Sequence, residues 1–557
     1  MMNHLRLKSR RERKNTSMRQ VMIFTACLIL VVSAETRAAD RIPKADILLT
    51  GGTVFDGTGS VGQAVDVAIL GDRIVAIGDL EVDRVGQKID CSGLVIAPGF
   101  IDLHNHSDNQ IIHPRTRANM NYLTQGCTTV VTGNCGSGPV NVGSYYEQID
   151  KHGAGTNVAH LLPQGALRNA VMGTADRKAN AQEIKNMRAL VGQAMADGAW
   201  GMSTGLIYVP SSYADIDELV EIAKVVSQSK GIYVSHIRNE NIGVLTAVHE
   251  ALNIGRRANL PVHISHFKSS GRESWGLVRR AAEMIETARA AGMVVTADQY
   301  PYIASSTSLD ATLIPTWARA GGREELIKRF NDPLASSRIR SAMIESLRKR
   351  EDGAVLQIAR YAPRPDFVGR NLLEIARSEK TDPLSLAVEI AKNGGASIVN
   401  FCMDEQDIRY IMKSSWVATA SDGRAYLPGS DQPHPRSYGT FSKKIGHYAI
   451  REKVISLQHA LRTSTGLPAD ILGMTDRGYL KKTFIADIVV FDSEEFIDLA
   501  TFKKPHQYSA GVKYVFVNGE VAIFNGQATG ALAGRALRHK KTSLNKVQQP
   551  APMKSGN

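Results

Sequence analysis

The stretch PGFIDLHNH (residues 98–106) governs how the rest of this sequence is interpreted. The apolar residues Leu94, Val95, Ile96, Phe100, Ile101 and Leu103 form a run that is typical of a buried strand. In a strand, side chains two positions apart point to the same face, so His104 and His106 are expected to converge on one point. Histidine is the commonest metal ligand in proteins, which makes the pair a candidate metal site. Histidines of the surface or the core give the same short pattern, so the decision depends on residues further along the chain.

Four further strand-like runs each lead to a polar residue at the start of a loop. Residues 128–132 lead to Cys135, 231–235 to His236, 261–265 to His266, and 416–420 to Asp422. In a parallel α/β barrel the carboxyl ends of all strands meet on one face, where the active site lies. The pattern therefore predicts that residues spread over more than 300 positions converge, namely His104, His106, Cys135, His236, His266 and Asp422.

The strand-like runs alternate with stretches of helical periodicity, and this alternation predicts βα units with a parallel sheet. The helical stretches cover residues 183–196, 215–229, 242–258 and 275–290. This alternation of strands and helices ends after Asp298. Residues 308–400 contain a charged helical stretch around 323–350, and we interpret them as an insertion over the barrel mouth, such as an active-site lid.

Short strands and glycine turns near both chain ends indicate a second, smaller domain. This pattern occurs throughout residues 43–94 and again at 486–491 and 512–519. β segments that are distant in sequence and flank a barrel are expected to meet in one small sandwich. The length of 557 residues suits a large barrel with such a satellite domain.

The formal net charge of +13 is concentrated in the two tails. Residues 1–38 hold eight Lys or Arg against two Asp or Glu, and residues 538–557 hold five basic side chains and no acidic one. The part of the chain between them is nearly neutral, which argues against nucleic acid as a partner. We expect residues 538–557 to form a basic, flexible tail.

The N-terminus has the layout of a secretion signal over residues 1–38. A basic stretch precedes the apolar residues 21–32, and small residues lead to Ala38. An apolar run of about twelve residues is too short to span a bilayer as a stable helix. We therefore expect an exported protein, periplasmic or secreted, with no stable membrane span after signal cleavage. An uncleaved N-terminal anchor is the alternative.

The five cysteines do not make a disulfide framework in a chain of this size. Cys91 and Cys402 have apolar neighbours and are expected to be small core residues. Cys127 and Cys135 lie at opposite ends of the strand predicted at 128–132, roughly 20 Å apart and beyond disulfide reach. This leaves Cys135 available as a thiolate ligand.

Taken together, these segments resemble the metal-dependent amidohydrolase superfamily and, within it, the D-aminoacylase (N-acyl-D-amino-acid deacylase) family. The resemblance covers roughly residues 45–538. The motifs that carry it are PGFIDLHNH (98–106), TTVVTGNCG (128–136), GMSTGLIYVPSSYAD (201–215), SHIRNE (235–240), ISHFK (264–268), DQYPYIASST (298–307), SDG (421–423) and HPRSYGTF (434–441).

The resemblance implies an α/β fold, namely a TIM-like (β/α)8 barrel with a small β-sandwich domain built from both chain ends and an insertion near the barrel mouth. On this sequence the sandwich takes residues 43–96 and 475–537. The barrel takes residues 97–474, with the insertion at about 308–400.

The resemblance also implies one tight Zn²⁺ site made by Cys135, His236 and His266. One thiolate and two imidazoles leave a position open for water, as catalytic zinc requires. His104 and His106 match a pair that holds a possible second, weaker metal.

One functional metal is favoured by the absence of a lysine near residues 201–205, because other superfamily members use a carboxylated lysine as a bridge. The thiolate of Cys135 would then take the bridging position. Asp422 matches the carboxylate that acts as general base toward the water and general acid toward the amine. The alternative for Asp422 is an N-cap of the helix after the eighth strand.

Four residues match positions that grip the carboxylate of the substrate, namely Lys268, Tyr300, Ser306 and Arg436. An arginine binds a carboxylate through two parallel hydrogen bonds, and a lysine acts as a point charge. Plain packing is the alternative, above all for Tyr300 within Tyr-Pro-Tyr. Glu240 is expected to brace its loop rather than to react.

One departure from the family pattern concerns a substrate contact. The family usually shows Gly-His-Gly after the third strand, whereas this chain has Leu162-Pro-Gln164-Gly165. An amide therefore replaces an imidazole that could hydrogen-bond the substrate or the transition state, while the metal set is intact. His263 lies three residues before His266 and is expected to point to the opposite face of its strand.

The activity that the resemblance implies is zinc-dependent hydrolysis of N-acyl-D-amino acids, which are small molecules, to a carboxylate and a free D-amino acid. The alternatives are a hydantoinase-like hydrolase of cyclic amides or a D-dipeptide hydrolase on the same scaffold, and an inactive scaffold that only binds. Lys268 and Arg436 favour the first activity, and the full metal set with Asp422 argues against inactivity. The sequence does not identify the acyl group, the amino acid or the oligomeric state.

Overall fold

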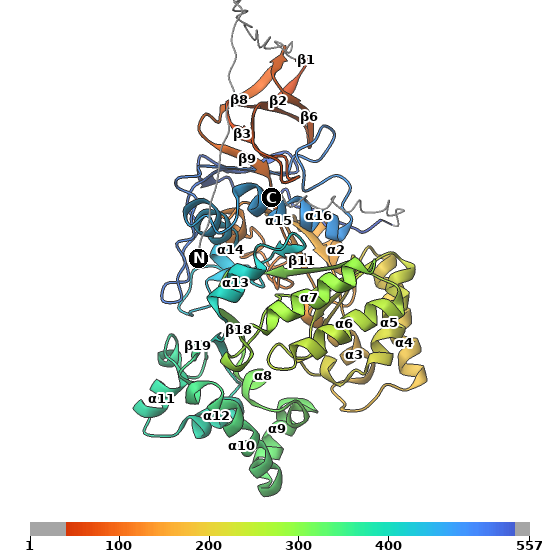
Figure 1. Cartoon of the computed structure of the whole chain (residues 1–557), viewed down its shortest axis with the longest axis vertical. Coiled ribbons are helices and arrows are strands. Elements are labelled where there is room, and N and C mark those ends of the chain that lie inside the picture. The colour runs from red at the N-terminus through yellow and green to blue at the C-terminus, as the bar shows by residue number, and fades with distance from the viewer. Residues whose placement is uncertain (1–39, 541–557) are drawn as a thin grey trace, which may run out of the picture. The chain divides into compact units, whose positions relative to one another are not determined.

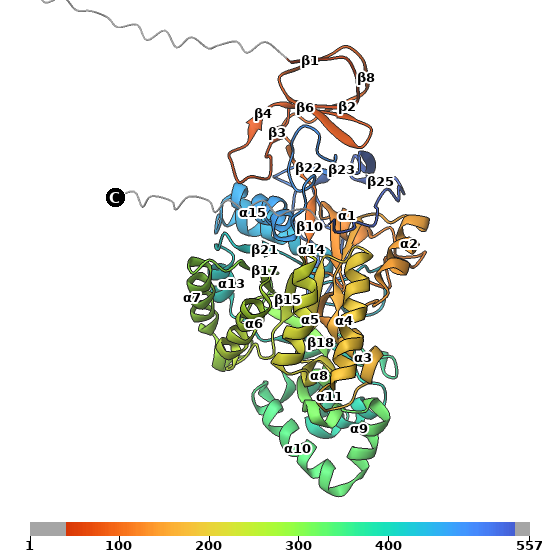
Figure 2. The ribbon, with the colours of Figure 1, turned by 90° about the vertical axis from the view of Figure 1, so that its right-hand side faces the viewer.

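The computed structural model of this protein describes residues 40–540, so the predicted signal over 1–38 and most of the basic tail lie outside the described residues. Parallel strands form the centre of the described region (Figures 1 and 2). One sheet has the order β10-β11-β12 and another the order β13-β14-β15-β16-β17-β21. The strands are β10 (Phe100–Asp102), β11 (Cys127–Thr132), β12 (Asn157–His160), β13 (Leu162–Pro163), β14 (Gly201–Gly205), β15 (Ile232–His236), β16 (Val262–Ile264), β17 (Val295–Gln299) and β21 (Val417–Thr419).

Backbone contacts join the two parallel sheets at both of their ends. β12 and β13 are separated only by Leu161, whose N–H donates to the carbonyl of Thr132 in β11. At the other end, Asn105 and Gly423 form a parallel bridge, and the N–H of Asp422 donates to the carbonyl of His104 at 2.8 Å. The segment that carries the histidine pair therefore lies beside the segment that carries Asp422.

The composition of the strands explains why they occupy the centre. All six residues of β11 and all five of β15 are buried, and β11 is rich in β-branched threonine and valine. Parallel strands are covered on both faces, so a continuous buried run is the expected pattern. The strands predicted at 128–132, 231–235, 261–265 and 416–420 are confirmed to within one residue at each end.

Four helices cover these strands side by side (Figures 1 and 2). They are α4 (Ala181–Ala196), α5 (Ile216–Gln228), α6 (Val244–Ala258) and α7 (Leu277–Ala290), and they confirm the four predicted helical stretches to within two residues. Local sequence fixes two of their starts. Asn180 and Glu183 form a capping box on α4, and the Asp215 carboxylate accepts the N–H of Glu218 at the start of α5.

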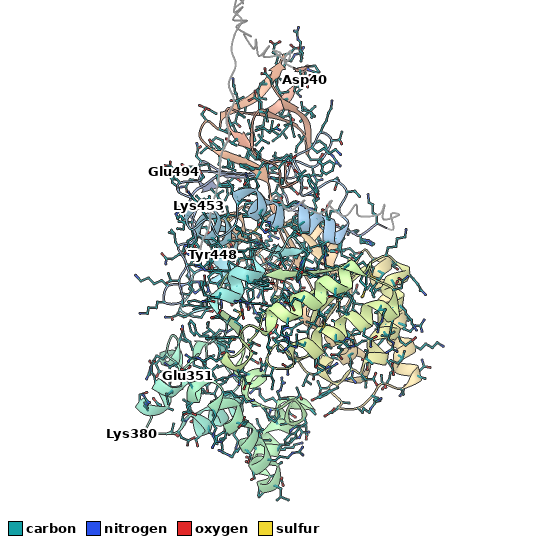
Figure 3. The ribbon with its side chains drawn as sticks, viewed as in Figure 1. Asp40, Glu351, Lys380, Tyr448, Lys453 and Glu494 are labelled. Carbon is teal, nitrogen blue, oxygen red and sulfur yellow. The ribbon has the colours of Figure 1, made fainter. Side chains whose placement is uncertain are left out.

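The remaining helices of this part are shorter. They are α1 (Met120–Leu123), α2 (Val142–His152), α3 (Gln164–Met172), α13 (Glu405–Ile411), α14 (Arg436–Ser442), the π-helix η7 (Lys443–Arg451), α15 (Leu457–Ser464) and α16 (Gly466–Leu472). Tyr448, labelled in Figure 3, belongs to the π-helix. Among residues 40–540, no helix combines the length and the apolar character needed to cross a bilayer.

A separate group of elements follows β17 and has its own sheet and core. The strands β18 (Ala304–Ser308), β20 (Ser397–Phe401) and β19 (Leu356–Arg360) pair antiparallel in that order. Its helices are α8 (Leu309–Leu313), α9 (Gly322–Asn331), α10 (Pro333–Arg348), α11 (Leu372–Ser378) and α12 (Pro383–Lys392). They pack on a hydrophobic cluster distinct from that of the parallel strands. Figure 1 draws α8–α12 as one group, and Glu351 and Lys380 in Figure 3 belong to it.

Strands from both chain ends share one sheet, which has the order β25-β24-β23-β22-β9-β3-β4. These strands are β25 (Gln527–Ala528), β24 (Glu520–Phe524), β23 (Val512–Val517), β22 (Ile488–Phe491), β9 (Val95–Pro98), β3 (Thr53–Val54) and β4 (Gln63–Ala64). A four-stranded sheet of β6 (Arg73–Gly78), β5 (Asp66–Leu70), β2 (Ala45–Thr50) and β8 (Val85–Asp90) shares a hydrophobic cluster with it. β1 (Asp40–Ile42) and β7 (Leu80–Val82) pair separately.

The first residues of the predicted tail contact the rest of the fold. Arg538 forms an ion pair with Asp150 at 2.7 Å, and the N–H of His539 donates to the carbonyl of Gly198 at 2.9 Å. The indole N–H of Trp200 donates to the carbonyl of Leu537. The ordered body therefore extends at least to His539, past the boundary predicted at residue 538.

Candidate metal and active site

The predicted ligand residues meet around the sulfur of Cys135. Its Sγ lies 3.2 Å from Nε2 of His104 and 3.4 Å from Nδ1 of His236. The same sulfur lies 3.7 Å from Nε2 of His266, and the facing nitrogens of His236 and His266 are 3.0 Å apart. The convergence predicted from the strand ends is therefore present, although the two residues of the His-x-His pair lie just beyond β10 rather than within it.

The separations between these donor atoms suit zinc. Zn²⁺ binds sulfur at about 2.3 Å and nitrogen at about 2.0–2.1 Å, so tetrahedral ligands lie about 3.5 Å apart for sulfur and nitrogen and about 3.3 Å apart for two nitrogens. Cys135, His236 and His266 have donor atoms within 4.8 Å of one another and are all buried. Burial raises the pKa of the Cys135 thiol, but the charges of His104 and His236 outweigh this effect and hold it well below its usual value. The cluster therefore favours the thiolate form of Cys135, which is the form in which cysteine binds a metal.

Three of these residues share an unusual backbone conformation. Cys135 has φ 52°, His266 has φ 34° and Asp422 has φ 52°, all in the left-handed region. Such angles are unfavourable for residues with a side chain and persist where the surroundings impose them. At the Cys135 turn, the N–H of Gly133 donates to the Asp108 carboxylate at 2.7 Å, and the N–H of Gly136 donates to the Ser203 hydroxyl at 3.0 Å.

Asp422 lies between the histidines and a guanidinium. One carboxylate oxygen is 3.1 Å from Nε2 of His106 and 3.6 Å from Nε2 of His104, and the other is 2.8 Å from Nη1 of Arg436. Burial raises the pKa of Asp422, but Arg436 and the nearby histidines outweigh this effect and hold it well below its usual value. The helix-cap alternative is wrong, because the next helix, α14, begins only at Arg436 with Pro435 at its N-cap.

Asp298 is a central residue that the sequence analysis missed. Its carboxylate accepts the backbone N–H of His266 at 2.6 Å, lies 2.8 Å from Nε2 of His263, and lies 3.5 Å from Nδ1 of His104. The side chain is fully buried at the end of β17. Its position, a polar residue near the end of a strand, was the available signal. The imidazole of His263 points toward this carboxylate, which also lies beside His104.

Lys268 is engaged with protein groups rather than free. Its ammonium lies 2.6 Å from a Glu240 carboxylate oxygen and 2.8 Å from Nδ1 of His266, and it donates to the carbonyl of His266 at 2.9 Å. Glu240 also lies 2.9 Å from Nδ1 of His266. An imidazole that offers Nε2 as a donor atom carries its proton on Nδ1 and donates it to Glu240, so Lys268 uses two of its three donors, on Glu240 and on the carbonyl of His266. Glu240 therefore orients His266 as well as bracing its loop, which the sequence analysis did not anticipate.

The three other predicted substrate residues line one cavity of about 680 Å³, together with Cys135 and Asp422. The guanidinium of Arg436 lies 4.8 Å from the ring centre of Tyr300, and the hydroxyl of Tyr300 is buried without a hydrogen-bond partner. The hydroxyl of Ser306 donates to the carbonyl of Ile398 within the inserted sheet at 2.9 Å. Arg436 and Tyr300 thus present groups to the cavity, whereas Ser306 is already bonded.

Gln164, which replaces the family histidine, takes part in a buried polar cluster. Its amide donates to Glu218 at 3.2 Å, and its carbonyl oxygen accepts from the hydroxyl of Ser211. Glu218 forms an ion pair with the buried Arg168 at 3.0 Å. Gln164 is absent from the residues that line the cavity, whereas its neighbour Gly165 is among them. Its side chain therefore supports the start of α3 rather than contacting a ligand.

Residues 87–523 match the amidohydrolase family. The chain belongs to this family, and the match covers most of its length.

The most informative relatives are D-amino-acid deacylases. A D-aminoacylase of Alcaligenes xylosoxydans xylosoxydans is 35% identical over 516 residues, which cover 88% of this chain and 97% of the relative. A solved D-aminoacylase, described with a binuclear metal centre, one-metal activation and second-metal attenuation, has a TM-score of 0.76 and 32% identity over 89% of this chain and all of that one. The N-acyl-D-glutamate deacylase of Bordetella bronchiseptica, solved with zinc and a phosphonate mimic of the tetrahedral intermediate, has a TM-score of 0.76 and 31% identity over the same shares.

Proposed function

We propose that this protein hydrolyses the amide bond of N-acyl-D-amino acids to a carboxylate and a free D-amino acid. The observation that carries the proposal is the convergence of Cys135, His236 and His266 beside Asp422 in a cavity that also presents Arg436. The relatives named D-aminoacylase and N-acyl-D-glutamate deacylase support the substrate class and the D configuration.

Cys135, His236 and His266 would hold one tight Zn²⁺, and His104 and His106 would contribute to a second, weaker site. When bound, zinc supplies a water of lowered pKa and polarises the amide carbonyl. Asp298 and Glu240 fix the orientations of the histidine rings through the contacts described above. The binuclear centre of the related D-aminoacylase supports two sites of unequal importance.

Asp422 would move the proton. Its carboxylate lines the cavity beside the donor cluster, where it would accept a proton from the attacking water and pass it to the nitrogen of the leaving amine. The low pKa set by Arg436 keeps the carboxylate ionised before the reaction. Binding of the substrate carboxylate to Arg436 would weaken this ion pair and make Asp422 a stronger base.

The parallel strands would form a closed (β/α)8 barrel, which the bridge between Asn105 and Gly423 supports. The sheets that share strands from both chain ends would form the small β-sandwich. The group from β18 to β20 contributes Ser306 and Arg360 to the cavity, which supports its interpretation as an insertion at the barrel mouth. The basic and apolar composition of residues 1–38 supports export through a signal.

The activity is tested by incubating the zinc-loaded full chain with matched N-acetyl-D- and N-acetyl-L-amino acids and detecting the free amine. We expect release from D substrates only. Equal release from both enantiomers contradicts the stereochemical part of the proposal, and no release from any D substrate by a protein with full zinc content contradicts the activity. Hydrolysis of hydantoins without hydrolysis of linear amides would establish the cyclic-amide alternative.

Arg436 should anchor the free carboxylate of the substrate. Arg436→Ala is expected to reduce kcat/KM for N-acetyl-D-leucine roughly 10- to 100-fold more than for N-acetyl-D-leucinamide, because a hydrogen bond to a charged group contributes about 1.5–3 kcal/mol. The change in kcat/KM on the amide reports the effect of Arg436 on Asp422, and the additional loss on the acid reports the carboxylate contact. Arg436→Lys, which keeps the charge, is expected to lose less on the acid. An equal loss on both substrates removes Arg436 from this role.

Asp298 should support the zinc site without touching the ligand. Asp298→Asn keeps the shape but removes the charge beside His104 and His263, and we expect zinc affinity to fall about 10- to 100-fold. Competition with a chelator measures this affinity directly. Thr296→Val, which removes only the 2.8 Å contact between Thr296 and His263, serves as the milder control. Unchanged zinc affinity in Asp298→Asn would show that the negative charge of Asp298 does not contribute to zinc binding.

A further inference from the structure

The acidic side chains that line the cavity all contact a basic side chain of the protein, whereas two of the lining arginines contact no acidic one. Glu240 and Asp422 are matched by Lys268 at 2.6 Å and by Arg436 at 2.8 Å. Asp431, the third lining carboxylate, lies 2.9 Å from Nε2 of His506. Each acidic group of the lining therefore has its own partner.

Two lining arginines have no such partner. Within residues 40–540, the guanidinium groups of Arg360 and Arg424 take part in no hydrogen bond, ion pair or ring contact. Arg424 is half-buried, whereas Arg360 is exposed. A solvated arginine on an open surface needs no explanation, but two in one ligand cavity leave it with two guanidinium groups that no protein carboxylate contacts.

The backbone of Arg424 is held firmly beside the reacting groups. Arg424 follows Asp422 by two positions, its N–H donates to the hydroxyl of Ser437 at 3.2 Å, and its carbonyl accepts from the Asn121 amide at 3.0 Å. The backbone is thus fixed while the guanidinium remains free for a ligand. An arginine presents its donors in a fork that matches a carboxylate.

Arg360 belongs to a polar row on the inserted sheet. It is the last residue of β19 and pairs with Ser397 of β20, which in turn pairs with Ser308 of β18. All three residues line the cavity. The row places one guanidinium and two hydroxyl groups, all hydrogen-bond donors, along the same wall.

We propose that Arg424, assisted by Arg360, forms an anion subsite that selects N-acyl-D-amino acids bearing a second carboxylate. This inference rests on the proposed function, in which Arg436 takes the carboxylate common to all substrates. A second carboxylate pairs with the guanidinium groups that the protein itself leaves unmatched. It is carried either by the side chain of the amino acid or by the acyl group, and both sources present the same chemistry.

The test compares kcat/KM within two pairs of substrates that differ only in charge. N-acetyl-D-glutamate and N-acetyl-D-glutamine examine the side chain, and N-succinyl- and N-succinamoyl-D-methionine examine the acyl group. We expect the wild-type protein to prefer the charged member of one pair by about tenfold or more, as a charge-assisted hydrogen bond provides. The pair that shows the preference identifies the source of the carboxylate.

Substitutions of the two arginines test whether they cause the preference for the charged substrate. Arg424→Gln should bring the ratio of kcat/KM for the charged substrate to kcat/KM for its neutral partner close to one. Arg360→Gln should reduce this ratio less, because the charge of Arg360 is more exposed to solvent. Arg424→Lys should retain part of the preference. Arg348→Gln, which removes an exposed arginine from α10, should leave the ratio unchanged. The neutral substrates report correct folding, because their turnover should persist in every variant.

Two results overturn the inference. One is a ratio near one for both pairs in the wild-type protein, and the other is an undiminished ratio when Arg424 and Arg360 are both replaced by glutamine. Failure of the proposed function has a different signature, since the neutral N-acyl-D-amino acids would then not be hydrolysed either.

Discussion

Replacing Cys135 by alanine is expected to release the metal and abolish amide hydrolysis together. The sulfur lies 3.2–3.7 Å from nitrogens of His104, His236 and His266, so its loss removes the one donor that all three histidines face. Without the metal, the water and the carbonyl lose their activation, and turnover should fall on the order of 10⁴-fold or more. Elemental analysis of the purified variant measures the metal, and amine release measures the activity.

Cys127→Ala is the matched control for this prediction. Cys127 is also fully buried, but it begins β11 and packs in the hydrophobic cluster rather than in the donor cluster. Both proteins lose a buried thiol, and only Cys135→Ala should lose zinc. Added zinc should raise the melting temperature of the wild-type protein and of Cys127→Ala by several degrees, and that of Cys135→Ala far less, because a ligand stabilises only a state that binds it. Full zinc content in Cys135→Ala would exclude the thiolate as a ligand.

The donor cluster was predictable because two simple rules operate together. Buried, β-branched strands such as β11 are recognisable from an apolar run, and the carboxyl ends of parallel strands meet on one face. Any polar residue just after such a run is thereby a candidate, and this selects Cys135, His236 and Asp422. The same rule applied to β17 would have selected Asp298, which the sequence analysis used only as the point where the alternation of strands and helices ends.

The pairing of charges was not predictable from the sequence. Lys268 and Glu240 lie in different loops, and only the fold shows that they are 2.6 Å apart. Arg436 likewise contacts Asp422, although the sequence between them does not indicate how the chain folds back. Side-chain partners depend on distances of an ångström, whereas hydrophobic periodicity fixes only which face a residue occupies. The protein partners of Lys268 and Gln164 were therefore not predictable from the sequence.

The antiparallel sheet of the insertion illustrates the same limit. The predicted boundary near residue 308 follows from the end of the alternation of strands and helices. In the structure, the first strand of this sheet begins at Ala304. The partner strand, β20, pairs with residues that lie 89 to 97 positions away in sequence. Pairing between short, distant strands leaves no periodic signal, so neither the sheet nor the position of Arg360 at the cavity was foreseeable.

Asp422→Asn is expected to retain zinc and fold while slowing turnover by on the order of 10²–10⁴, the usual contribution of a positioned general base. The amide of asparagine fills the same space between His106 and Arg436 but cannot take up the proton of the attacking water. Zinc content and melting temperature should remain close to those of the wild-type protein, which separates this variant from Cys135→Ala. Asp217→Asn, at an exposed carboxylate paired with Arg257, controls for the chemical change. Near-normal turnover in Asp422→Asn with intact zinc would mean that another group moves the proton. Glu240, which lines the cavity and contacts His266, would be the next residue to replace.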